Sequence, residues 1–390
     1  MSHKRNWPLM QDTVSMSDKM RILKFIISSN NFTSGEKVRE FENKWSNWLG
    51  SKHSLFVSSG STANFLLVAA IKEKYGLKNG DKVLLPACTW MTNVAPIIQL
   101  GLQPIFADIN LKNYSFDTDD LKRIKSLHPD IKLIFVTHLL GFPANNNKYQ
   151  EIFPDALIID DVCESHGCKF DNQSKVGSNS LGATFSFYFG HHMTTIEGGM
   201  VSTNDTDLYD LMKMKRSHGL ARESINFDYW SDKYDYMEKS FLFITDGYNF
   251  RNHEIPAVLG ISQLNRLDKM IDTRRINFEK YYKIILNYSD QFYVPEYSTG
   301  NSSFAFPFIA KNKTVFDSLK ILFQENGIEY RPVVSGDLLR QPFLSSEKMA
   351  SGQDHYNVHK LNTGLYIGNN HFVNQKNFDV LTSILRLVDG

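Results

Sequence analysis

Short apolar runs alternate with amphipathic segments through the first half of the chain, and no other feature of the sequence restricts the fold as much. The runs that read as buried strands, some with the turn that follows, lie at 54–61, 82–90, 103–109, 132–140, 156–162, 183–189 and 198–203. Helical spacing predicts helices at 17–29, 36–49, 62–75, 91–100 and 206–217. Strands that alternate with helices pair in parallel through right-handed crossovers. The sequence therefore predicts an α/β fold with a mainly parallel central sheet.

The pattern changes near residue 255. Residues 254–287 read as one long helix, and an apolar run at 302–310, a helix at 314–325 and a run at 329–334 follow. We therefore expect a large domain over 1–265 and a smaller C-terminal α+β domain over 266–390. No Gly/Ser-rich linker marks the boundary, so its position is soft.

The charge balance excludes two classes of partner. Lys and Arg number 43 against 42 Asp and Glu, which gives a formal net charge of +1. Such a chain offers no field to attract a nucleic-acid backbone or an anionic membrane, so we expect neither as a partner. No apolar run is long enough for a membrane span, and the N-terminus has no apolar core of a secretory signal.

Cysteine usage indicates a reducing compartment. The chain has three cysteines, Cys88, Cys163 and Cys168, and no CxxC pair. An odd count without that spacing fits neither a disulfide scaffold nor a common zinc site. We therefore expect a cytoplasmic protein.

Ligands of open α/β sheets bind beyond the carboxyl ends of the strands, and polar residues gather there in this chain. The turn at 58–63 (SSGSTA) joins a predicted strand to a helix start, where free N–H groups suit a phosphate. Plain helix capping by Ser61 or Thr62 explains the same residues. At the next strand end stands Trp90, which could stack on a planar ligand or pack in the core.

Two further strand ends carry ionisable side chains. Asp160 and Asp161 close an apolar strand, with Glu164 and His166 just behind. A carboxylate there could hold a protonated ring nitrogen, bind a metal or cap a helix. The string 184–199 (TFSFYFGHHMTTIEGG) is the most specific in the chain. Its adjacent His191 and His192 point in different directions, and an imidazole that titrates near neutral pH is suited to general-base work.

Taken in order, these four segments resemble the sugar aminotransferase branch of the fold-type-I pyridoxal phosphate (PLP) enzymes. The resemblance extends from about residue 20 to the C-terminus. One position departs from the family pattern, because the Schiff-base lysine expected between Ser186 and Glu197 is replaced by His191. No lysine occurs between Lys175 and Lys213, so no covalent lysine link to the cofactor can form there.

A histidine at this position is typical of the sugar 3-dehydratases within the family. The 184–199 string and residues 331–336 (RPVVSG) resemble the dehydratases of the colitose pathway, which act on GDP-4-keto-6-deoxy-D-mannose for O-antigen and lipopolysaccharide synthesis. A second subgroup with this histidine carries a [2Fe–2S] cluster. Such a cluster needs four thiolates, and this chain has three cysteines in all, so we expect no iron–sulfur cluster.

The resemblance implies a reaction and a set of roles. Pyridoxamine phosphate would join the C4 ketone of a nucleotide-linked 4-keto-6-deoxy sugar, the C3 hydroxyl would leave as water, and L-glutamate would re-aminate the cofactor. His191 would be the base. The implied cofactor-binding residues are Gly60, Ser61, Trp90, Asp161, Glu164, Ser186 and, across a homodimer with shared active sites, Asn249. The implied substrate-binding residues are His218, Arg251 and Arg331.

Three other functions stay open on the sequence alone. The chain could be a ketosugar aminotransferase with an unusual base, or a catalytically silent binder of cofactor or sugar nucleotide. It could also be a metal hydrolase that uses His191, His192 and His218. The role of His192, the nucleotide and the sugar stereochemistry are not fixed by any short motif.

Overall fold

The large sheet forms from strands whose successive residues pack on opposite faces. The structure, a computed structural model, describes residues 6–344 and 356–389. Within these residues the large sheet contains β1 (His53–Val57), β2 (Lys82–Pro86), β3 (Gln103–Ala107), β4 (Leu133–Thr137), β5 (Leu157–Asp161), β6 (Ala183–Ser186) and β7 (Gly199–Thr203), in the order β1-β7-β6-β5-β4-β2-β3. Only β7 runs antiparallel to its neighbours. This confirms the predicted α/β fold with a mainly parallel sheet.

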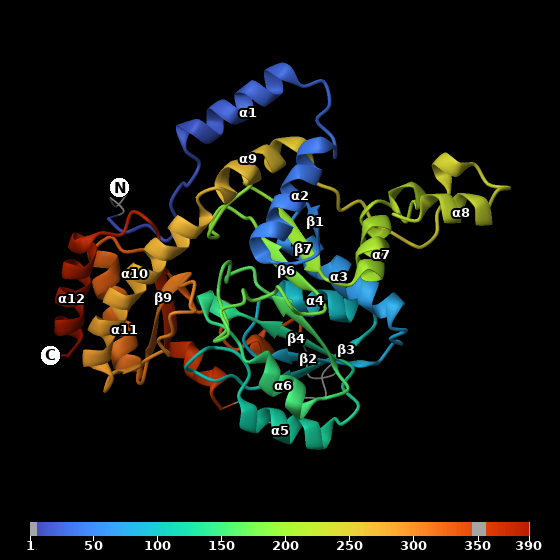
Figure 1. Cartoon of the computed structure of the whole chain (residues 1–390). Helices are drawn as coiled ribbons and strands as arrows, with labels where there is room; N and C mark the ends of the chain where they lie inside the picture. The colour runs from blue at the N-terminus through green and yellow to red at the C-terminus, as the bar shows by residue number, and fades with distance from the viewer. Residues whose placement is uncertain (1–5, 345–355, 390) are drawn as a thin grey trace.

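Helices cover both faces of this sheet (Figure 1). One face packs against α3 (Gly60–Lys74), α4 (Met91–Gln99) and α7 (Thr206–Arg216). The other face packs against α2 (Glu36–Leu49), α5 (Thr118–Leu127), α6 (Asn146–Ile152) and α9 (Glu254–Leu264). Because both faces are buried, the strands are largely apolar, and this is why the sequence predicted their positions.

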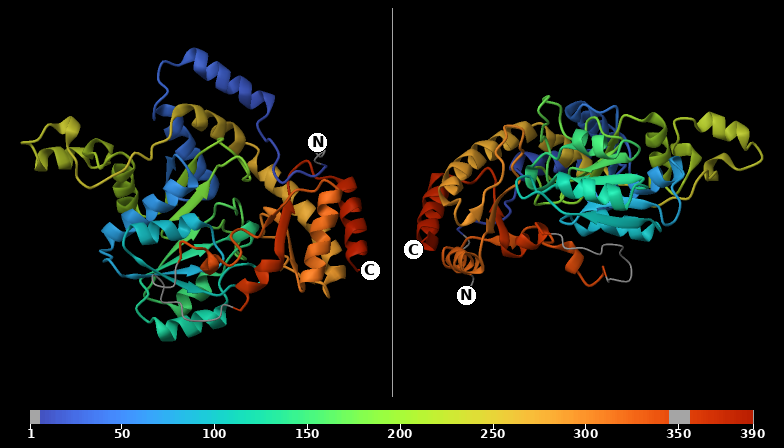
Figure 2. Two further views of the ribbon diagram at one scale, coloured as in Figure 1. Left: turned by 180° about the vertical axis from the view of Figure 1, so that it is seen from behind. Right: turned by 90° about the horizontal axis from the view of Figure 1, so that it is seen from below.

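A second sheet lies beside the first. Its antiparallel order is β10-β11-β9-β8, built from β8 (Phe292–Tyr293), β9 (Ala305–Ala310), β10 (Tyr330–Pro332) and β11 (Gly364–Gly368). The helices α10 (Leu267–Ile285), α11 (Lys313–Glu325) and α12 (Gln375–Asp389) pack with it (Figure 2). The start of the described chain joins this layer, because Trp7 is buried there and donates from Nε1 to the Gly368 carbonyl at 2.8 Å.

The long helix expected over 254–287 is two helices, α9 and α10. The break falls at Asn265 and Arg266, where Arg266 has φ −123° and leaves the helical region. Helix α1 (Met16–Ser28) lies on α9, and residues 221–245 form an arm around α8 (Phe227–Lys233) that projects from the body (Figures 1 and 2). No helix in the described part of the chain is both long and apolar enough to cross a membrane.

Candidate active site

The turn before α3 is built around Gly60. Ser59 caps the helix: its hydroxyl accepts from the Thr62 N–H at 3.1 Å, and the Thr62 hydroxyl accepts from the Ser59 N–H at 3.0 Å. The cap expected at Ser61 or Thr62 is therefore wrong, and Thr62 is instead the reciprocal partner of the cap. The N–H groups of Gly60 and Ser61 stay in the first turn, where a helix cannot pair them internally.

Three other segments close on this turn. A Cβ at Gly60 would lie 2.7 Å from the Cβ of Ser186 and 3.3 Å from the Cys163 sulfur. A Cβ at Gly199 would lie 2.2 Å from the Ser59 carbonyl oxygen. The glycines therefore allow β5, β6 and β7 to reach the helix start. The result is a tight turn whose first N–H groups have no partner within the helix, which suits a phosphate.

β5 ends in two carboxylates that point to opposite faces of the sheet. Asp161 is 5% exposed on the α3 side, and its Oδ1 accepts from the Cys163 N–H at 2.9 Å. Among the described residues it has no lysine or arginine partner. A buried carboxylate without a cation suits a protonated ring nitrogen. Asp160, on the other face, accepts instead from Asn146.

Glu164 follows three residues later and is half-buried. Its Oε2 accepts from the Leu140 N–H at 3.0 Å. Burial, together with the negative charge of Asp161, raises the pKa of Glu164 to about 7, although the Leu140 bond opposes this. The carboxyl group is therefore poised to hold or release a proton near neutral pH.

Trp90 begins α4 and remains 57% exposed. The residues beneath it are fixed: the Thr89 and Thr137 hydroxyls lie 2.7 Å apart, and the Asn93 amide donates to Thr137 at 3.1 Å. From the second layer, the Ser335 hydroxyl donates to the Thr89 carbonyl at 2.8 Å. An exposed indole on a rigid base can stack on a planar ligand.

His191 lies in the loop between β6 and β7. Its ring centroid is 6.1 Å from that of His166 and 5.7 Å from that of Phe304, and its Nδ1 is buried without a hydrogen-bond partner. Burial, and then the positive charge of Arg274, lower the pKa of His191 to about 4. The imidazole is therefore neutral at pH 7 and has a lone pair free to accept a proton.

His192 packs against the same two rings as His191, with its ring centroid 5.4 Å from that of His166 and 5.8 Å from that of Phe304. It is fully buried, and its Nε2 lies 3.1 Å from the Ser302 carbonyl oxygen, to which it donates. This bond ties the loop to the second sheet. Within residues 6–344 and 356–389 no group of three His, Cys, Asp or Glu side chains is arranged to hold a metal ion. The metal hydrolase reading that joins His191, His192 and His218 is therefore wrong.

The substrate-binding residues expected from the sequence fall in two places. His218 lies beside Arg251, with 3.4 Å between Nε2 and Nη2, and Arg251 donates to the Asn249 oxygen at 3.2 Å. This group borders the phosphate turn, because Ser58 donates to the Phe250 carbonyl at 3.0 Å.

Arg331 comes from the second sheet. It is exposed on β10, opposite Tyr366 of β11. Burial raises the pKa of Tyr366, and the charge of Glu164 raises it further, whereas Arg331 opposes the rise. Tyr366 therefore lies within the electrostatic reach of both Glu164 and Arg331.

Sequence reasoning missed Arg274, Phe304 and Tyr366. They come from the second layer, and Arg274 is buried, with one guanidinium nitrogen donating to the carbonyls of Phe304 and Asn369. No local motif surrounds any of them. Only the helical spacing of 267–285 could have indicated that Arg274 faces inward.

Comparison with known proteins places the chain in a family. The model of the DegT/DnrJ/EryC1/StrS aminotransferase family matches residues 15–363. A GDP-4-keto-6-deoxy-D-mannose 3-dehydratase from Yersinia pseudotuberculosis is 36% identical over 86% of this chain and 86% of its own length. The solved structure of the Escherichia coli GDP-4-keto-6-deoxy-D-mannose-3-dehydratase with bound hydrated PLP has a TM-score of 0.89 at 31% identity, over 98% of this chain and 100% of that one.

A second solved structure contains the cofactor joined to glutamate. A GDP-4-keto-6-deoxymannose-3-dehydratase with a trapped PLP-glutamate geminal diamine has a TM-score of 0.87 at 31% identity, over 97% of this chain and 100% of that one. The family match covers most of the chain, includes the whole large sheet, and ends at residue 363, just before β11. This chain belongs to the DegT/DnrJ/EryC1/StrS aminotransferase family.

Proposed function

We propose that this chain is a PLP-dependent 3-dehydratase that removes the C3 hydroxyl of GDP-4-keto-6-deoxy-D-mannose. The observation that carries the proposal is His191, a neutral imidazole at the loop position where the family resemblance expects a lysine. Relatives and solved structures with this activity match the chain over nearly its whole length. An imidazole moves protons but forms no stable covalent link with the cofactor, which favours dehydration over transamination.

The residues of the site fit PLP. The tight turn at Gly60 leaves N–H donors at a helix start for the phosphate, with Ser61 and Ser186 beside it. Asp161 would hold the pyridine nitrogen protonated, and the exposed indole of Trp90 would stack on the ring. When bound, the cofactor in its amine form supplies the amino group and the electron sink.

The protein's own groups move protons and orient the sugar. His191 Nδ1 is buried, so we assign Nε2 as the atom that removes the proton and that returns one to the departing C3 hydroxyl. Glu164, whose pKa of about 7 leaves it partly protonated, holds a second proton at the site. His218, Arg251 and Arg331 are cationic or polar groups suited to the phosphates of the nucleotide or to the glutamate carboxylate.

The overall reaction balances without an external reductant. L-Glutamate and the 4-keto-6-deoxy sugar give the 3,6-dideoxy-4-keto sugar, 2-oxoglutarate and ammonia. The two electrons that reduce C3 of the sugar come from oxidation of the glutamate amine carbon. The proposal includes no iron–sulfur cluster, because three cysteines fall one short of the four thiolates that a cluster needs.

A homodimer with shared sites is part of the proposal. The arm around α8 exposes large apolar side chains, among them Ile225 at 52%, Tyr236 at 77% and Phe241 at 64%. An exposed apolar patch of this kind is typical of a protein interface. Asn249 at the base of the arm would then contact the cofactor phosphate of the partner. We place the enzyme in the cytoplasm, where its three free thiols remain reduced.

Mass spectrometry tests the proposal directly. The purified protein is incubated with PLP, L-glutamate and a panel of nucleotide-linked 4-keto-6-deoxy sugars. From the GDP-linked sugar we expect a product that has lost one oxygen and gained no nitrogen, with 2-oxoglutarate released in equal amount. An amino sugar product would instead establish an aminotransferase, and no product with any sugar would favour a silent binder.

A further inference from the structure

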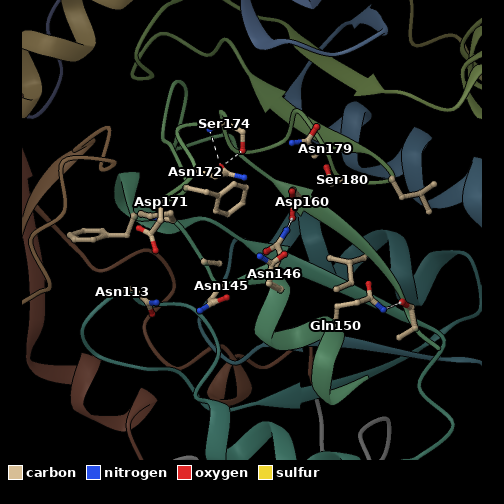
Figure 3. Close-up of a pocket in the computed structure, with 18 of the residues that line it drawn as sticks. Asn113, Asn145, Asn146, Gln150, Asp160, Asp171, Asn172, Ser174, Asn179 and Ser180 are labelled. Atoms are coloured by element: carbon tan, nitrogen blue, oxygen red, sulfur yellow. Dashed lines mark hydrogen bonds between the residues drawn. The ribbon is translucent and has the colours of Figure 1, made fainter. Parts of the chain in front are cut away.

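A cleft of about 840 Å³ opens on the face of the large sheet that points away from the site described above. Its walls come from α6, the end of β5, the hairpin at 169–175 and the segment 296–301. Figure 3 shows its polar side chains, with Asp160 and Asn146 in contact at the centre. The volume is in the range of small-molecule sites.

The floor of the cleft is the Asp160 carboxylate, which is fully buried. Its Oδ1 lies 2.8 Å from the Asn146 Nδ2 and 3.2 Å from the His138 Nε2. The His138 Nδ1 accepts from the Ala144 N–H, so the ring proton is on Nε2, which lies near Asp160 without completing a hydrogen bond. Oδ1 is thus satisfied by the Asn146 amide.

The second oxygen of Asp160 is not satisfied. Among the described residues nothing donates to Asp160 Oδ2, and the Asn146 Oδ1 beside it is also buried without a partner. A buried acceptor without a donor is costly, and two of them side by side in the wall of a cleft indicate a bound group with hydrogen-bond donors.

The rim of the cleft provides hydrogen-bond donors, whereas the floor provides acceptors. Asn113, Asn145 and Asn172 each use their oxygen to accept from a nearby backbone N–H. Their NH₂ groups have no acceptor within the described part of the chain and remain as donors for a ligand. An ammonium ion would satisfy only the floor, whereas a hydroxyl both donates and accepts and so satisfies the floor and the rim.

The charge of the lining residues further restricts the kind of ligand that the cleft can bind. The cleft is lined by Asp155, Asp160, Asp171 and Glu296, and no described lysine, arginine or histidine lines it. Phosphates and carboxylates are therefore repelled. Phe170 lines the wall as well and gives an apolar surface for the C–H face of a sugar ring.

We propose that this cleft is a second binding site, separate from the catalytic one, for a neutral saccharide whose hydroxyls donate to Asp160 Oδ2 and Asn146 Oδ1. The inference does not depend on the proposed dehydratase function, because no residue of the cleft takes part in it.

Saturation-transfer NMR on the full-length holoenzyme tests the proposal. The probes are methyl glycosides of neutral hexoses and 6-deoxyhexoses, with glucuronate and glucosamine for comparison. We expect signals from neutral glycosides that survive excess GDP, and no signal from glucuronate. Asp160→Asn keeps the shape and places an NH₂ where the free oxygen was, so it should weaken binding by about tenfold or more.

Matched variants distinguish a loss of saccharide binding from a loss of folding. Glu151→Gln makes the same chemical change on α6 outside the cleft lining and should bind like the parent. Asn146→Leu fills the floor and should abolish the signal if Asp160→Asn proves unstable by thermal unfolding. Signals that GDP removes, signals from glucosamine alone, or no signal from any neutral glycoside at millimolar concentration would each overturn the proposal.

Discussion

The imidazole of His191 is the residue on which the proposed chemistry depends. Asn at position 191 keeps a polar side chain of similar size but cannot take up a proton. We expect His191→Asn to retain PLP while dehydration falls by roughly 10²–10⁴-fold, the usual loss when a general base is removed. Cofactor absorbance measures the first quantity and product mass the second. Unchanged turnover would remove His191 from the mechanism.

Lysine at the same position is the companion variant. If residue 191 lies within reach of the cofactor carbonyl, His191→Lys should form a covalent link that borohydride makes permanent, and the intact mass should rise accordingly. The His191→Asn protein, treated in the same way, is the control and should show no adduct. A lysine variant without an adduct would mean that this loop does not face the cofactor.

Glu164 gives a prediction about pH. Its pKa is raised from 4.5 to about 7 in the folded protein. Between these two values the folded chain holds a proton that the unfolded chain has released, so folding stability contributed by this group falls as pH rises through that window. Glu164→Gln stays neutral and should lose this decline. Thermal unfolding of the apoprotein from about pH 4.5 to 7 measures it.

The matched control for Glu164 is an exposed carboxylate. Glu151 on α6 pairs with the exposed Lys148 among the residues that the structure describes. Glu151→Gln should leave the pH dependence of unfolding as it is in the parent. If Glu164→Gln and the parent give parallel curves, burial does not hold the Glu164 proton.

At the scale of elements, the sequence predicted the helices and strands whose apolar residues follow a regular local pattern. β2 and β3 are apolar after their first residue, and β5 is apolar up to its two terminal aspartates, because helices bury both faces of these strands. Their positions could therefore be predicted directly from the sequence. β11 contains Gly364 and Gly368 and could not be distinguished from a loop. No proline or glycine marks the break between α9 and α10. The apolar residues keep their helical spacing across it, so the sequence predicted one continuous helix.

The residues of the candidate site likewise fall into those with a local sequence signal and those without one. The turn at Gly60, Asp161 and His191 lie at strand ends within recognisable strings, so the sequence could single them out as candidates. Arg274 and Tyr366 reach the site only because the second layer packs against the first, and such packing leaves no short motif. The sequence therefore predicted the site residues that stand in local motifs, but not those that only tertiary packing brings to the site.

Gly199, the first residue of β7, yields a prediction at this scale. A side chain there would collide with the backbone of Ser59, at 2.2 Å from its carbonyl oxygen. We expect Gly199→Ala to push the turn away from β7, to destabilise the fold by about 1–3 kcal/mol and to weaken PLP retention. Thermal unfolding and PLP dissociation measured on the same samples test this. Normal retention of PLP would show that the turn does not need this close approach.

At the scale of the whole molecule, the arm and the phosphate turn would belong to different active sites. If sites are shared, His191→Asn damages the site in its own chain, whereas Asn249→Ala damages the site of the partner. Each variant alone should form inactive dimers. In a mixed dimer, one of the two sites then receives both intact residues.

Mixing the two inactive proteins is therefore decisive. After partial unfolding and reassembly, we expect product formation to return in the mixture but in neither protein treated alone. Size-exclusion chromatography with light scattering confirms that dimers have reformed. Recovery cannot occur if Asn249 serves the site of its own chain, because every mixed dimer would then contain one site without His191 and one without Asn249. A mixture that stays inactive with dimers present would place Asn249 in its own chain's site.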